Sequence, residues 1–108
     1  MTRASDIMSK KVVSIETTVS ATEVAKIMDR NNVGCVVLTQ NDKPYGIITE
    51  RDFLSKVTAL NKKPSDLSAK EIMSSPVTLV YSYAPVDEVA QQMLSQKIRH
   101  VIVVDGEQ

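Results

Sequence analysis

The chain of 108 residues has few of the residue types that usually mark catalytic or metal sites. It contains one cysteine, one histidine and no tryptophan, and only 4% of its residues are aromatic. A single cysteine excludes an internal disulfide and favours a reducing cytoplasm. One histidine and one cysteine cannot form a structural zinc site. No set of nucleophile, base and orienting group is visible, so we expect no enzymatic activity.

Charge of one sign and long hydrophobic runs are also missing. The 13 basic and 13 acidic residues cancel, which leaves a formal net charge of zero. A neutral chain with few aromatic residues is a poor candidate for binding nucleic acid or an anionic membrane. The longest apolar runs are strand-sized, far short of the ~20 residues that span a bilayer, and no secretory pattern is seen at the N-terminus. We therefore expect a soluble, cytoplasmic, globular chain.

What the chain does contain is an internal repeat. The segment A-S-D-I-M-S at residues 4–9 returns as A-K-E-I-M-S at residues 69–74, and the match continues without a gap. A repeat longer than the roughly 20 to 50 residues of solenoid units indicates two copies of a small module that pack together. Two related halves also create related clefts, where ligands tend to bind.

The first copy is predicted to fold as strand, helix, strand, strand, helix. We expect strands at residues 12–15, 36–38 and 45–48, with a hairpin turn at residues 41–44. Ser20 and Glu23 match a capping box at the start of the first helix, which Asn31 and Asn32 end. The predicted apolar sides of the two helices consist of Ala21, Val24, Ala25 and Met28, and of Phe53, Leu54, Val57 and Leu60.

The second copy follows a polar linker and is shorter. We assign residues 1–60 to the first module, 61–68 to the linker and 69–108 to the second module. Ser68 and Glu71 match another capping box, strands are expected at residues 77–80 and 101–104, and a helix is expected to start near Pro85. The apolar side of that helix comprises Val86, Val89, Ala90, Met93 and Leu94. The last strand and helix of this module are missing from the sequence. Either a partner chain covers the open strand edge, or the sequence is truncated, which is the interpretation we favour.

Three motifs within the repeat resemble tandem CBS domains, the module named after cystathionine beta-synthase. They are I-M-S at residues 7–9 and 72–74, G-I-I-T-E-R-D at 46–52, and I-R-H-V-I-V-V-D at 98–105. The second fits the G-h-h-T-x-x-D signature of the family, where h is apolar. The resemblance covers essentially the whole chain. It implies an α+β fold of two β-α-β-β-α modules, related by a pseudo-twofold axis, with their sheets packed face to face.

The resemblance also implies a function. Such pairs bind adenosine-containing ligands (AMP, ADP, ATP, S-adenosylmethionine or NAD-type dinucleotides) in the clefts between their modules, and they commonly form homodimers. By this resemblance the chain is a regulatory sensor without a cofactor, and its output goes through conformational change or dimerisation to an effector protein. The alternative is a structural module that dimerises or docks to a partner without any ligand.

Two residues of the second motif suit a ribose and a phosphate. Thr49 and Asp52 lie in the first turn of one predicted helix, where a carboxylate can accept two ribose hydroxyls and a threonine can donate to a phosphate. T-x-x-D at a helix start is equally a plain N-cap, and this alternative stays open. The resemblance implies that Arg99 and His100 contact the phosphate of the ligand held by Asp52. Otherwise, Arg99 is a solvated charge and His100 a half-buried ring.

The remaining predicted contacts come from the resemblance alone. It assigns ligand contacts to Arg51, Met73, Thr78 and Ile98. In the second cleft the basic pair is replaced by Gly34 and Cys35, so we expect at most one competent site. Cys35 heads an apolar run and is expected to be a small buried hydrophobic residue.

Overall fold

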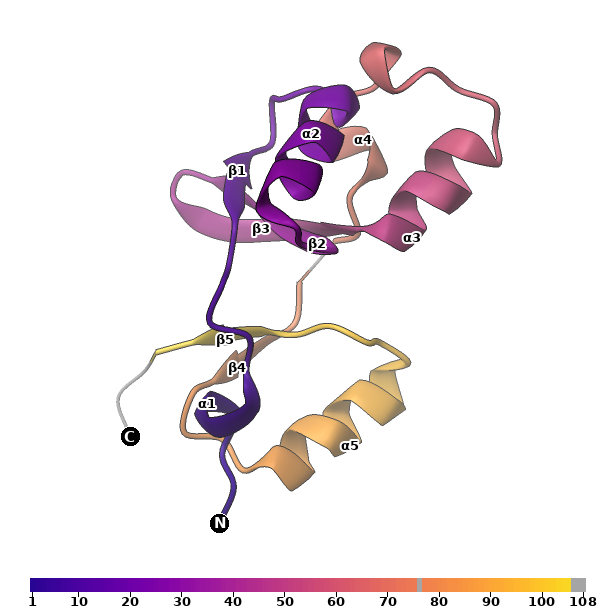
Figure 1. Cartoon of the computed structure of the whole chain (residues 1–108). Helices are drawn as coiled ribbons and strands as arrows, with labels where there is room; N and C mark the ends of the chain where they lie inside the picture. Colours follow the sequence, from indigo (N-terminus) through magenta and orange to yellow (C-terminus); the bar gives the residue numbers. More distant parts are fainter. Residues whose placement is uncertain (76, 106–108) are drawn as a thin grey trace. The chain divides into compact units, whose positions relative to one another are not determined.

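The computed structural model describes residues 1–75 and 77–105 (Figure 1). Helices and strands are interspersed along the chain, and the structure divides into two compact units. One unit comprises residues 11–75, and the other combines residues 1–10 with residues 77–105. No helix in these described ranges is both long enough and apolar enough to cross a bilayer.

The unit of residues 11–75 is built on a sheet of three strands. The strands are β1 (Ser14–Glu16), β2 (Cys35–Gln40) and β3 (Lys43–Thr49). The first two pair in parallel, and the last two form the predicted antiparallel hairpin. The turn itself is only Asn41 and Asp42, both in the left-handed region with φ of 55° and 61°. Asparagine and aspartate tolerate this conformation and favour such tight hairpins.

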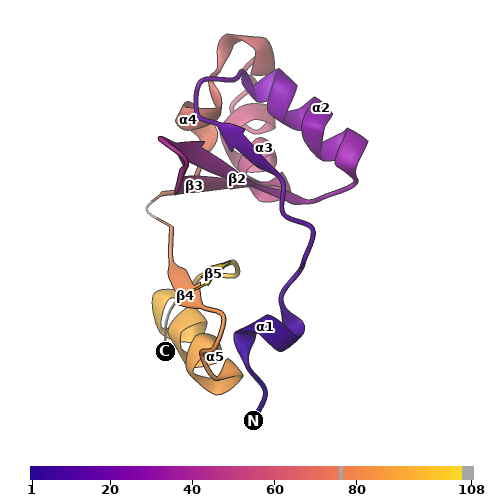
Figure 2. The ribbon, with the colours of Figure 1, turned by 90° about the vertical axis from the view of Figure 1, so that its left-hand side faces the viewer.

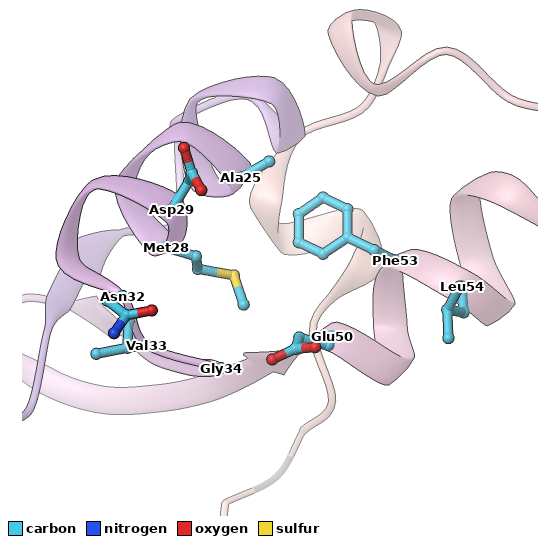
Figure 3. Close-up of a pocket in the computed structure, with 9 residues that line it drawn as sticks. All are labelled: Ala25, Met28, Asp29, Asn32, Val33, Gly34, Glu50, Phe53 and Leu54. Carbon is cyan, nitrogen blue, oxygen red and sulfur yellow. The ribbon is translucent and has the colours of Figure 1, made fainter.

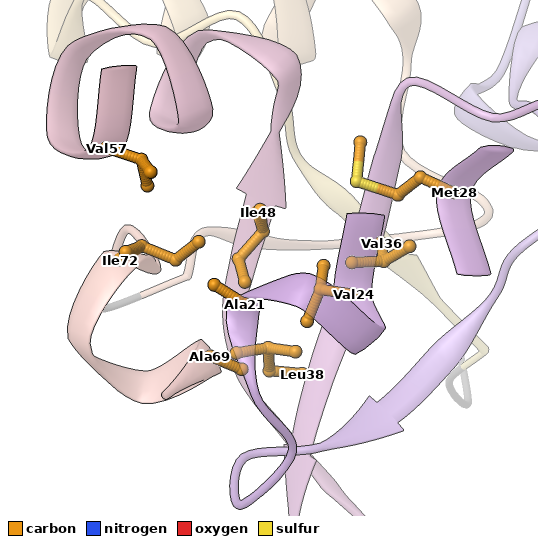
Figure 4. Close-up of a cluster of buried hydrophobic side chains, with 9 residues drawn as sticks. All are labelled: Ala21, Val24, Met28, Val36, Leu38, Ile48, Val57, Ala69 and Ile72. Atoms are coloured by element: carbon orange, nitrogen blue, oxygen red, sulfur yellow. The ribbon is translucent and has the colours of Figure 1, made fainter. Parts of the chain in front are cut away.

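Three helices cover one face of this sheet (Figures 1 and 2). They are α2 (Ala21–Asn31), α3 (Glu50–Phe53) and α4 (Ala69–Ile72). A π-helical turn, Leu54–Thr58, continues α3, and a 3-10 turn, Pro64–Asp66, lies within the predicted linker. The hydrophobic core between helices and sheet consists of Ala21, Val24, Met28, Val36, Leu38, Ile48, Val57, Ala69 and Ile72 (Figure 4).

The second unit is smaller and less well buried. It contains α1 (Ala4–Ile7), β4 (Leu79–Tyr81), α5 (Val86–Gln96) and β5 (Ile102–Val104), and its two strands pair in parallel. Pro85 is the N-cap of α5, one position before the helix. No residue of α5 is buried, and Leu94 is 79% exposed. The predicted apolar side of this helix is therefore not a buried core face within the unit, because a sheet of only two strands offers it little surface.

The opening segment of each repeat packs against the other repeat. Ala69 donates its backbone N–H to Val19 O at 2.7 Å, and Ala4 donates to Ala84 O at 2.8 Å. The repeat relates these two contacts to each other. The structural units therefore group the residues differently from the repeat, because α4 completes the core of residues 11–75, while α1 lies beside α5 and β4.

Several local predictions are confirmed and others are wrong. Asn32 ends α2 in the left-handed conformation, and the reciprocal capping box of Ser68 and Glu71 is present. Ser20 accepts a hydrogen bond from Glu23 N, as predicted, but the Glu23 carboxylate pairs with Arg30 instead of closing the box. Some residues predicted to be apolar core or strand are exposed or outside their element. These are Val12, Ala25, Leu54 and Leu60. On the predicted apolar side of the second helix, Val57 lies in the core and Phe53 packs against it, whereas the π-helical turn leaves Leu54 and Leu60 exposed.

Candidate functional site

Asp52 lies in the first turn of α3 and closes the N-cap box of that helix. Its Oδ2 accepts a hydrogen bond from Thr49 N at 2.9 Å and lies 3.4 Å from the Thr49 hydroxyl. The Thr49 backbone is extended, as is usual for an N-cap residue. The structure thus contains the contacts that the capping interpretation predicts, while a ribose role for the same carboxylate stays a prediction.

The other carboxylate oxygen of Asp52 is bound by two side chains from different segments. Lys56 Nζ lies 2.9 Å from Oδ1, and Ser74 Oγ donates to Oδ1 at 3.1 Å. Asp52 is only 5% exposed. A buried charge is costly unless it is paired and hydrogen-bonded, and these contacts provide both.

Lys56 connects α3 to the end of α4. It sits in the π-helical turn, four residues after Asp52. Its ammonium group donates to Ile72 O at 3.0 Å and Met73 O at 3.2 Å, and lies 3.5 Å from Ser74 Oγ. A cation at the C-terminal carbonyls of a helix is electrostatically favourable. Lys56 therefore fixes the segment that follows α4 beside the carboxylate.

Two backbone hydrogen bonds and a close packing contact hold the same segment on β3. Ser74 N donates to Ile47 O at 2.8 Å, and Ile47 N donates to Ser74 O at 3.1 Å. At Gly46 a Cβ atom would lie 2.5 Å from Met73 Sδ and 3.1 Å from Ser74 O. The absence of a side chain at Gly46 lets the segment approach the strand this closely.

The structure brings together three of the predicted site residues and adds two. The Lys56 ammonium group contacts the Asp52 carboxylate and Met73 O, and the same carboxylate contacts Thr49. Arg51 is exposed, and its side chain makes no hydrogen bond or ion pair with the residues that the structure describes. Lys56 and Ser74 were not predicted. The i, i+4 spacing of Asp52 and Lys56 is the sequence signal that could have identified the lysine.

The other predicted residues belong to the second unit, and their approach to Asp52 stays a prediction. They are Thr78, Ile98, Arg99 and His100. The Thr78 hydroxyl is 2.9 Å from Gln96 Oε1, and Ile98 N donates to Met93 O at 3.0 Å. Arg99 and His100 are both exposed. Within their own unit, these two side chains are available to solvent.

Cys35 lies opposite Thr49 in the pairing of β2 and β3 and is half-buried. Burial raises the pKa of the Cys35 thiol, and the negative charge of Asp52 raises it further. A thiol that ionises only above its usual range is a weak nucleophile at neutral pH. The side chain therefore suits a small apolar packing role better than a chemical one.

A pocket of about 490 Å³ lies between α2 and α3 (Figure 3). Met28 and Phe53 supply its apolar wall, and the carboxylates of Asp29 and Glu50 stand at its margin. Its other lining residues are Ala25, Asn32, Val33, Gly34 and Leu54. None of the lining residues is basic, so the pocket is unsuited to a phosphate. Asp52 is not part of its lining.

Within residues 1–75 and 77–105, no group of three or more metal-ligating side chains comes together. The candidate site is therefore a polar cluster around one buried carboxylate. Its carboxylate accepts hydrogen bonds from Thr49 and Ser74 and pairs with Lys56.

Comparison with known families and proteins gives consistent matches over the chain. The CBS domain family matches residues 4–59 and again residues 69–108. An uncharacterized protein of Methanopyrus kandleri is 36% identical over 101 residues, covering 93% of this chain and 52% of that protein. The L-aspartate semialdehyde sulfurtransferase of Methanocaldococcus jannaschii is 35% identical, covering 97% of this chain and 20% of that enzyme. The chain thus spans about half of the first relative and a fifth of the second.

Solved structures of similar proteins include ligand complexes. A CBS domain protein from Pyrobaculum aerophilum complexed with AMP is 36% identical, with a TM-score of 0.81, over 96% of this chain and 79% of that chain. The CBS domain pair of protein MJ0100, in complex with 5'-methylthioadenosine and S-adenosyl-L-methionine, is 34% identical with a TM-score of 0.81 over 96% of this chain and 81% of that chain. The hexameric CBS-CP12 protein from bloom-forming cyanobacteria is 28% identical with a TM-score of 0.90, over 99% of this chain and 60% of that chain.

Proposed function

Because the chain belongs to the CBS domain family, we propose that it is a regulatory module that binds an adenosine-containing ligand and passes the binding on as a conformational change. Two similar proteins are described in complex with AMP and with 5'-methylthioadenosine and S-adenosyl-L-methionine. These ligands share an adenine ring and a ribose. The shared nucleoside, rather than the phosphate or the sulfonium group, is therefore the chemistry that the proposal assigns to this chain.

The observation that carries the proposal is the buried carboxylate of Asp52. It is 5% exposed, and four donor contacts from Thr49, Lys56 and Ser74 hold it in one position. A fixed carboxylate is an effective partner for a pair of ribose hydroxyls, because hydrogen bonds to an ionised acceptor are stronger than neutral ones. We assign the ribose to Asp52 and, for ligands that carry one, the phosphate to Arg99 and His100.

Ligand binding and the substitution of Asp52 test this proposal together. Thermal unfolding is measured with and without AMP, 5'-methylthioadenosine and S-adenosylmethionine. A ligand at 100 times its Kd stabilises the folded chain by about 2.7 kcal/mol, which is several degrees for a protein of this size. Asp52→Asn should abolish the shift for all three ligands, while Asp66→Asn, the same charge change at an exposed position, should keep it.

The proposal fails if none of the three ligands raises the melting temperature at millimolar concentration. It also fails in its assignment of Asp52 if Asp52→Asn lowers the melting temperature but leaves the ligand-induced shift intact. In that case the carboxylate acts only as a cap and an ion-pair partner.

Self-association without a ligand is the second candidate function. It is favoured by apolar side chains that the described residues leave exposed, including Leu54 at 59% and Leu94 at 79%. A contiguous exposed apolar patch commonly marks a contact with another protein. We propose a homodimer as its form, and an effector protein as a further partner. The oligomeric state at micromolar concentration, measured by light scattering in the absence of ligand, tests it.

A further inference from the structure

The carboxylate that we assign to the ribose has no free acceptor position. An ionised carboxylate offers about four lone-pair positions. Thr49 N, Thr49 Oγ1, Ser74 Oγ and Lys56 Nζ, at 2.9, 3.4, 3.1 and 2.9 Å, together supply four donor contacts. A ribose hydroxyl can therefore bind Asp52 only by displacing one of these donors.

The ammonium group of Lys56 has more acceptors nearby than it has hydrogens to donate. It carries three hydrogens, but four acceptors lie within 3.5 Å of Nζ. These are Asp52 Oδ1, Ile72 O, Met73 O and Ser74 Oγ. If Lys56 lost Asp52, its three hydrogens would still have three acceptors. Ser74 Oγ can accept a hydrogen bond from Lys56 while it still donates its own hydrogen bond to the carboxylate.

The other donors are held more firmly. Thr49 N belongs to the backbone at the junction of β3 and α3, and its bond to Asp52 closes the helix cap. Ser74 is fixed by its two backbone hydrogen bonds to Ile47. The Lys56 side chain is 38% exposed, and Ser74 is exposed as well. Lys56 differs because it keeps three other acceptors when it leaves Asp52. Lys56 is thus the donor that an incoming hydroxyl displaces most easily.

We propose that Lys56 competes with the ligand for Asp52 and thereby sets the affinity of the site. This inference rests on the proposed function, and it adds a positioning residue that regulates the same carboxylate. In the free protein Lys56 occupies Oδ1. In the bound protein one ribose hydroxyl takes that position, and the ammonium group keeps Ile72 O, Met73 O and Ser74 Oγ. Removal of the ammonium group exposes the carboxylate to the ligand and should strengthen binding.

The test measures affinity and stability in the same variants. The Kd of 5'-methylthioadenosine is determined by calorimetry for the full chain, for Lys56→Met and for Lys56→Gln. This ligand has the ribose diol but no phosphate, so an attraction between Lys56 and a phosphate does not enter. Lys63→Met, at an exposed lysine of the linker, is the matched control. We expect both Lys56 variants to bind about threefold to tenfold more tightly, as befits the loss of a partly exposed ion pair, and the control to bind as the parent chain does.

Stability separates competition from a purely structural role. The Lys56 variants lose the contacts with Ile72 O and Met73 O and should melt at a lower temperature. A structural role alone predicts that affinity falls with stability, whereas competition predicts that affinity rises while stability falls. Lys56→Gln keeps a donor for one carbonyl and serves if the methionine variant does not fold.

Each result decides between the two proposals. If the parent chain binds 5'-methylthioadenosine and the Lys56 variants bind it equally or more weakly, competition by Lys56 is wrong and the proposed function stands. If neither the parent chain nor the Lys56 variants bind it, competition by Lys56 is wrong, and the proposed function stands only if AMP or S-adenosylmethionine binds. If only the Lys56 variants bind, the competition is stronger than expected and the inference is supported. A 2',3'-dideoxyadenosine control, which lacks both hydroxyls, should show no dependence on Lys56.

Discussion

Ser74 and Ile47 exchange two backbone hydrogen bonds, with N–O distances of 2.8 and 3.1 Å. This pair attaches the end of α4 to β3, although the two belong to different copies of the repeat. The attachment positions Ser74 Oγ on Asp52 and two carbonyl oxygens on Lys56. The backbone pair is thus the support on which the polar cluster is built.

The close contact at Gly46 predicts that adding one methyl group at this position lowers the stability of the protein. In Gly46→Ala the new Cβ would lie 3.1 Å from Ser74 O, a backbone atom that cannot move without straining its bond to Ile47. We expect a loss of about 1–3 kcal/mol in the free energy of unfolding, as for other overpacked sites. Urea denaturation measures it.

Gly34→Ala is the matched control for this substitution. Its Cβ would also be close to another atom, 2.6 Å from Glu50 Oε1. That oxygen is the end of a flexible, exposed side chain, which can rotate away. We expect a change of less than about 0.5 kcal/mol, typical of surface substitutions. Equal losses in the two variants would mean that the approach of Ser74 to β3 is not the constraint.

The raised pKa of the Cys35 thiol predicts a loss of stability at alkaline pH. The folded state holds the proton more tightly than the unfolded state, in which the thiol ionises near pH 9.0. This contribution to stability is complete below that pH and is lost as the pH rises toward the higher pKa of the folded state. Denaturation at pH 7.5 and 9.5 should show a larger decrease for the parent chain than for Cys35→Ala. The same decrease in both would assign the effect to other groups.

The exposed side chain of Leu54 predicts a role in self-association. If the surface around α3 forms a homodimer contact, Leu54→Glu places a charge in it and should shift the protein to the monomer. Ser55→Glu introduces the same charge one residue later on the same segment. Sedimentation of both variants at several concentrations provides the measurement. A dimer that persists in Leu54→Glu would locate the contact elsewhere.

The sequence predicted the strands, α2, α5 and the start of α3 because their signals are local, whereas α1 and α4 were not among the predicted elements. Asn32 stops α2 by adopting a conformation that few residues tolerate, and Ser68 and Glu71 cap α4 through contacts three residues apart. The exposure of Leu54 could not be predicted in the same way. A π-helical turn changes the angle between successive side chains, and the periodicity of an ordinary helix then assigns them to the wrong side.

In the candidate site, contacts between residues close in sequence could be predicted, and contacts between residues far apart in sequence could not. Thr49 and Asp52 lie in one helical turn, and their pattern alone identified the capping contact. Ser74 lies 22 residues from Asp52 in sequence and reaches it only because the end of α4 pairs with β3. The four donor contacts to the carboxylate, and hence the competition at Lys56, depend on that pairing and are visible only in three dimensions.

The helix α4 belongs to the second copy of the repeat but packs into the core of the unit of residues 11–75. This arrangement limits where the chain can be cut or fused to another protein. A fragment cut at residue 60 would leave behind Ala69 and Ile72, two members of the hydrophobic interior. A chimera that inherits residues 11–75 as one uninterrupted piece keeps that interior whole. Because the core needs residues from both copies of the repeat, gene duplication or deletion should affect both copies together more readily than one copy alone.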